Sequence, residues 1–131
     1  HLVRAILEGV AYNTRWVLDG IEGLGFKVER LNAAGGGALS GVWLQIYADV
    51  LGKRIRQVQF PQEAGSRGAA LTALVGLGIY KDFDSVAELV PLGREFEPQD
   101  KHRAIYEELY GCFQQLCEQL APIYGRLNPS T

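Results

Sequence analysis

A run of three glycines, Gly35 to Gly37, is the segment of this chain whose residue types suit a ligand site. It follows a candidate strand and precedes a predicted helix, whose free N–H groups and dipole favour an anionic or polar ligand at that end. Glycine has no Cβ, so a nucleotide could lie directly against the main chain. The run lacks the last glycine of G-x-G-x-x-G and the Gly-Lys-Ser/Thr of a Walker loop. From spacing alone, a nucleotide loop and a plain strand-to-helix turn are equally good interpretations.

Other reactive side chains do not form a recognisable catalytic set. The sequence has no G-x-S-x-G, which excludes the hydrolase nucleophile elbow. His102 stands among charged residues near a helix start, and we predict a solvated histidine. Asp49 and Glu63 flank a candidate strand without an evident carboxylate partner, so solvated or capping roles are predicted for them. Trp16 and Trp43 are predicted to be core or interface residues rather than substrate platforms.

Composition narrows the class of protein. The 131 residues carry a formal net charge of -2, with 47% hydrophobic and 21% charged residues, as in an ordinary globular domain. Lys and Arg form no basic stripe, so neither nucleic acid nor an anionic membrane surface is a favoured partner. Nothing resembles a signal peptide or a membrane-spanning run. Cys112 and Cys117 point in different directions on a predicted helix, which indicates two reduced thiols in a cytoplasmic protein.

Apolar spacing predicts a βαβ unit within a mostly helical chain. Two short strands with a helix between them imply a parallel pair, and two strands alone make a marginal sheet. Small residues in the helix after the second strand predict close packing against another backbone. The predicted elements are a first helix stopped by Gly25, a strand over 26–32, a helix capped by Ser40 and ended by Gly52, a strand over 55–60, a helix over 64–80, a short helix with a Ser85–Glu88 capping box, a connector over 92–98, and a long helix capped by Asp100 that Pro122 ends or kinks.

Four blocks of this sequence, in order, resemble the C-terminal part of the FGGY family of carbohydrate kinases, and xylulokinase-like members in particular. Residues 1–12 resemble the end of a family signature and its continuation, and the Gly35–Ser40 run resembles the adenosine loop. Residues 43–52 resemble the helix behind that loop, and residues 63–70 the glycine-bearing helix that follows. The resemblance covers residues 1 to about 80.

The resemblance implies an α/β chain that is part of the C-terminal lobe of the actin-like (ribonuclease H-like) ATPase fold, mostly helical with two short parallel strands. It implies a parent enzyme that uses Mg²⁺ and ATP to phosphorylate a sugar hydroxyl, a xylulose-like pentulose being favoured, with the sugar bound by the other lobe. The positions that carry over as backbone contacts to ADP or ATP are Gly36, Gly37, Ala38, Ser40 and Gly41. Gly41 departs from the adenine-contacting Asn of glycerol kinases, so no base contact through that side chain is expected.

No catalytic, sugar-binding or metal-binding residue carries over, so this chain alone is expected to be inactive. It contains no methionine and opens in helical rhythm, which favours a lobe fragment over residues 1–127 with a disordered tail over 128–131. Missing sheet neighbours predict a homo-oligomer. Two other hypotheses stay open: a free-standing nucleotide-binding module without kinase activity, and a helical interaction domain whose glycine run is only a turn.

Overall fold

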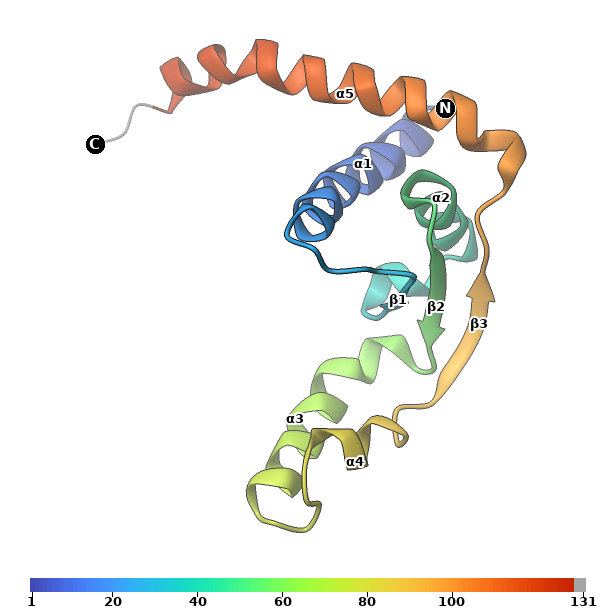
Figure 1. The fold of residues 1–131 in the computed structure, drawn as a ribbon, viewed down its shortest axis with the longest axis vertical. Helices are drawn as coiled ribbons and strands as arrows, with labels where there is room; N and C mark the ends of the chain where they lie inside the picture. The colour runs from blue at the N-terminus through green and yellow to red at the C-terminus, as the bar shows by residue number, and fades with distance from the viewer. Residues whose placement is uncertain (129–131) are drawn as a thin grey trace.

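The computed structural model describes residues 1–128, which form five α-helices and a three-stranded sheet. Figure 1 shows α1, α2 and α5 gathered at one end of the molecule, while α3 and α4 extend from the other end of the sheet. Two short 3-10 turns precede α2 and α3. The elements are α1 (Leu2–Gly23), β1 (Arg30–Ala33), α2 (Gly41–Leu51), β2 (Arg54–Val58), α3 (Ala64–Gly76), α4 (Phe83–Ala87), β3 (Leu92–Phe96) and α5 (Asp100–Leu127).

The sheet has the order β1-β2-β3. β1 and β2 are parallel, with Arg30 opposite Arg54, and α2 is the crossover between them, as the sequence predicted. β3 pairs antiparallel with β2. The prediction of a connector over 92–98 was therefore wrong, since residues 92–96 form a strand. Its sequence gives little strand signal, because only its end residues Leu92 and Phe96 are apolar and Phe96 alone is buried. Pairing with β2, rather than a local pattern, therefore makes this segment a strand.

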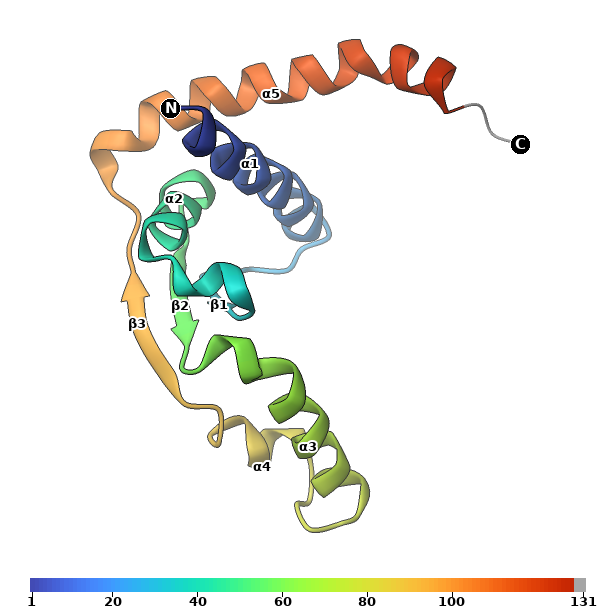
Figure 2. The same ribbon diagram turned by 180° about the vertical axis from the view of Figure 1, so that it is seen from behind.

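The main core lies where α1, α2 and α5 meet. Figure 2 shows from behind that α5 crosses the N-terminal end of α1 and then continues past α1. A second cluster joins α2 to the sheet through residues such as Leu44, Ile55 and Phe96. The main cluster consists of Ala11, Tyr12 and Leu18 of α1, Ile46, Val50 and Leu51 of α2, and Tyr106 and Tyr110 of α5. The candidate loop over 35–40 thus joins a sheet edge to a helix that is buried on both sides.

Several predicted boundaries were wrong. β1 is confined to residues 30–33, since only there does the chain pair with β2. Asp82, not Ser85, is the N-cap of α4, and the capping box joins these two residues. The cap position of α5 is Gln99, with Asp100 as the first helical residue. α5 also continues through Pro122 to Leu127, so of the two predicted effects of this proline the ending of the helix does not occur.

The glycines of α3 have no close neighbour among the described residues, so the predicted close packing is not found within residues 1–128. The helix ends at Gly76, four residues before the predicted end at Tyr80, and has no buried residue. A Cβ added at Gly65, Gly68 or Gly76 would find no heavy atom within 4 Å among the described residues. Within residues 1–128, no helix is long and apolar enough to span a membrane.

Candidate functional site

The glycine run forms a short 3-10 turn that leads straight into α2. Gly35 begins it at φ +84°, a backbone conformation that side chains disfavour, and residues 36–39 follow as the turn. Ser40 is the N-cap of α2, as predicted, because its Oγ accepts the Trp43 N–H at 3.3 Å. The loop thus presents its main chain at the N-terminal end of an α-helix.

Two hydrogen bonds tie this loop to the end of β2 and the turn after it. The Gly35 N–H donates to the Pro61 carbonyl at 2.8 Å. The Gln57 side chain donates from Nε2 to the Ala38 carbonyl at 2.6 Å. These bonds use one donor and one acceptor of the loop. The N–H groups of Gly36 and Gly37 donate to no acceptor among the described residues, so they are available to a ligand.

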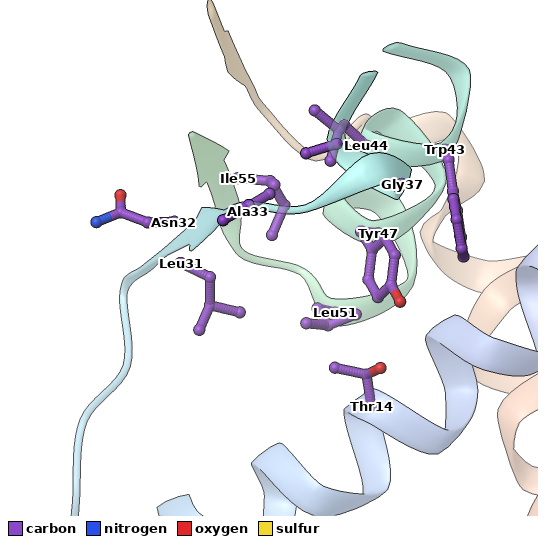
Figure 3. Close-up of a pocket in the computed structure, with 12 residues that line it drawn as sticks. Thr14, Leu31, Asn32, Ala33, Gly37, Trp43, Leu44, Tyr47, Leu51 and Ile55 are labelled. Atoms are coloured by element: carbon purple, nitrogen blue, oxygen red, sulfur yellow. The ribbon is translucent and has the colours of Figure 1, made fainter. Parts of the chain in front are cut away.

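A cavity of about 440 Å³ lies beside the loop, between β1, α2 and α1. Figure 3 shows Leu31, Tyr47 and Leu51 pointing into the same space, with Thr14 of α1 below them. Pockets of this size hold small organic ligands, and an apolar lining suits a flat ring system. Among the described residues that line it, none carries a charge: they are Thr14, Leu31, Asn32, Ala33, Ala34, Gly37, Ala38, Trp43, Leu44, Tyr47, Leu51 and Ile55.

The structure brings two of the five predicted site residues to this cavity, Gly37 and Ala38. A Cβ at Gly36 would meet no heavy atom within 4 Å among the described residues, so this glycine faces open space. The Ser40 hydroxyl is engaged as the helix cap. Gly41 faces β3, where an added Cβ would lie 3.5 Å from the Phe96 ring.

Sequence reasoning missed the aromatic wall of the cavity. Trp43, predicted to be a core or interface residue, is half-buried and lines the cavity together with Tyr47. Their ring centroids are 5.8 Å apart. The signal available in the sequence was the four-residue spacing of Trp43 and Tyr47 in the helix that Ser40 caps, because residues at i and i+4 share one helix face.

Asp49 and His102 form a second polar centre, so the prediction of a solvated His102 is wrong, and of the two roles predicted for Asp49 the structure shows capping. The Asp49 side chain is 2% exposed, and its Oδ2 lies 2.7 Å from Nδ1 of the half-buried His102. Its Oδ1 accepts the Gln99 N–H at 2.9 Å and the Gln45 side-chain amide at 2.9 Å. Asp49 does have a capping role, but for α5 rather than for its own helix. By contrast, Glu63 is exposed, as predicted.

Three tyrosines at the interface of α1 and α5 hold their protons more tightly than usual. The Tyr110 hydroxyl donates to Asp19 at 2.6 Å, and burial, followed by this bond, raises the pKa of Tyr110 to about 12. Burial also raises the pKa of Tyr12 and of Tyr106. The Tyr106 hydroxyl donates to Glu8 at 2.9 Å. The bonds that Tyr106 donates to Glu8 and Tyr110 donates to Asp19 join the two helices only while these hydroxyls are protonated.

Alkaline pH is therefore expected to destabilise the fold. A tyrosine whose pKa rises from about 10 in the unfolded chain stabilises the native state fully below pH 10 and loses that contribution as pH rises toward 12. Urea unfolding at pH 8 and pH 11 should show that Tyr110→Phe loses less stability between the two values than the unchanged chain. Tyr124→Phe, at an exposed position of the same helix, is the control. Equal losses in the unchanged chain and Tyr110→Phe would contradict this assignment.

Comparison with known proteins finds that the chain is similar to part of several carbohydrate kinases. Residues 1–77 match the FGGY family of carbohydrate kinases, C-terminal domain. A xylulose kinase of Staphylococcus epidermidis is 31% identical over 117 residues, which are 88% of this chain and 23% of that protein. The crystal structure of xylulose kinase from Rhodospirillum rubrum is 32% identical to this chain, with a TM-score of 0.77. The match covers 95% of this chain and 25% of the xylulose kinase chain.

A crystal structure of Plasmodium falciparum glycerol kinase with ADP is 25% identical to this chain, with a TM-score of 0.70. The match covers 88% of this chain and 24% of the glycerol kinase chain. The chain therefore spans about a quarter of the length of the relatives it matches. These neighbours have the actin-like ATPase fold, so the predicted fold class is confirmed, with a third strand added.

Proposed function

Because the chain belongs to the FGGY family of carbohydrate kinases, through the C-terminal domain of that family, we propose that it is the nucleotide-binding part of an ATP-dependent sugar kinase. The observation that carries the proposal is the uncharged cavity beside the Gly35–Ser40 loop, which Gly37 lines and to which the loop brings a free main-chain N–H group. A related glycerol kinase structure contains ADP, which supports a nucleotide as the ligand.

The residues present fit the adenosine part of ATP. The wall of Leu31, Trp43 and Tyr47 can cover the faces of a purine ring, and the main chain of Gly37 and Ala38 borders the same space. Such a cavity holds and orients the nucleoside and excludes water from the base. The bound nucleotide would supply the γ-phosphoryl group that the parent enzyme transfers to a sugar hydroxyl.

The same residues do not fit the polyphosphate or Mg²⁺. Within the described chain, no Lys or Arg side chain borders the cavity, and no group of three or more His, Cys, Asp or Glu residues is placed to hold a metal ion. We therefore assign the phosphates, the metal and the sugar to residues outside this chain. A xylulose-like pentulose is our proposed acceptor, on the basis of the xylulose kinases among the relatives.

Adenosine is expected to perturb the loop more than a phosphate chain does. In amide NMR spectra of the 131-residue chain, adenosine and ADP should shift the signals of Gly36 and Gly37 and slow their hydrogen exchange. Tripolyphosphate should do neither, because no Lys or Arg among residues 1–128 borders the cavity. Gly125, at the far end of α5, is the internal control. If neither adenosine nor ADP changes the amide shifts and exchange rates of Gly36 and Gly37, the glycine run is a plain turn and the proposal is contradicted.

A further inference from the structure

We propose that Trp43 is a positioning residue for the candidate nucleotide loop, and that its indole ring is the reason why residue 37 is glycine. The proposal deepens the function proposed above and rests on it for the binding step. Glycine in such a loop is commonly explained by the approach of the ligand to the main chain. Here the space that a side chain would need is already filled from within the protein.

The contact between Gly37 and Trp43 is closer than any side chain permits. A Cβ built at Gly37 would lie 2.7 Å from Cζ3 of Trp43, 3.1 Å from Cε3 and 3.4 Å from Cη2. Three atoms of one aromatic ring therefore face the position of the missing side chain. At the neighbouring Gly36 a Cβ would meet nothing within 4 Å among the described residues. The steric demand for glycine is thus specific to residue 37.

The ring of Trp43 is supported at this contact by a second aromatic ring. It packs on Tyr47, one turn further along α2, with 31° between the ring planes. Its own backbone N–H is fixed by the Ser40 cap at 3.3 Å. Both ends of the contact are therefore anchored, since Gln57 holds the adjoining Ala38 carbonyl at 2.6 Å. Aromatic rings packed in this way resist displacement by an added methyl group.

Trp43 acts through the shape of its ring rather than through hydrogen bonding. Its Nε1 is buried and has no hydrogen-bond partner among the described residues. Replacing Trp43 with phenylalanine therefore removes no hydrogen bond, and it leaves an aromatic ring beside Tyr47. Because a phenylalanine side chain is shorter, it opens space opposite residue 37.

A double-mutant cycle tests the proposal. Gly37→Ala alone should reduce the folding equilibrium constant of the 131-residue chain about tenfold or more, measured by urea unfolding. In a Trp43→Phe background the same change should cost less than about twofold. Gly36→Ala is the matched control for stability, and its unfolding midpoint should stay at or above that of the unchanged chain. An equal loss from Gly37→Ala in both backgrounds would overturn the steric assignment.

Adenosine affinity, measured by titration calorimetry, tests the positioning role. Gly37→Ala should weaken adenosine binding about tenfold in the unchanged background and by less than about threefold in the Trp43→Phe background. Coupling in stability without coupling in affinity would overturn the positioning role. If the unchanged chain binds no adenosine, the proposed function and the positioning role both fall. The unfolding measurements would then still decide whether Trp43 excludes a side chain at residue 37.

Discussion

Asp49→Ala is expected to lower the free energy of unfolding by about 2–4 kcal/mol. The Asp49 carboxylate is almost fully buried and accepts hydrogen bonds from the Gln99 N–H and the Gln45 amide, with His102 at 2.7 Å. Alanine would leave these groups without their shared acceptor, and it would remove a negative charge from the N-terminal end of α5. The start of α5 should therefore detach from α2 before the rest of the fold unfolds.

Asp100→Ala is the matched control for this substitution. Asp100 is the first residue of α5 and is exposed, so its removal should cost no more than about 1 kcal/mol. Asp49→Asn should fall between the two variants, because it keeps a carbonyl acceptor for Gln99 but loses the charge that faces His102. Urea unfolding gives the three values, and hydrogen exchange at residues 99–103 locates the effect. A loss from Asp49→Ala no larger than that from Asp100→Ala would show that Asp49 does not anchor the helix.

The local part of the site could be predicted from the sequence. Ser40 stands one residue before an apolar helical stripe, and a serine in that place caps a helix through a bond between near neighbours. The glycine run and the crossover helix likewise follow from local chemistry, and together they predicted the parallel pair of β1 and β2. The resemblance to the FGGY family, carried by the same residues, was confirmed by the comparisons.

What the sequence did not predict depends on contacts between distant segments. Asp49 and His102 are 53 residues apart, so no local spacing relates them. β3 becomes a strand because β2 offers it an edge, as Ile55 pairs with Phe96 across 41 residues of chain. Gly37 and Trp43 are only six residues apart, but their contact depends on the direction of the Trp43 ring. The packing of that ring on Tyr47 determines its direction. The intrinsic secondary-structure propensity of the residues predicts none of these contacts.

Two surfaces of the described chain are uncovered, and they predict how the chain behaves by itself. β1 is an outer strand of the sheet, so one side of it presents unpaired backbone groups among residues 1–128. On α1, Val3, Val10 and Val17 are 70%, 42% and 60% exposed. They recur at multiples of seven residues, which places them on one face of the helix. A continuous apolar stripe of this kind is uncommon on the surface of a monomer.

The purified 131-residue chain is therefore expected to self-associate through α1 and the β1 edge, with a two-fold dimer as the simplest form. Burying apolar side chains of two copies against each other removes them from water, which favours association. Val17→Glu should shift the chain toward monomer in light scattering, since it places a charge within the α1 face. Leu127→Glu, at an equally exposed apolar position near the end of α5, should leave the association unchanged. A stable monomer at high concentration that binds no apolar dye would show that these surfaces do not drive assembly.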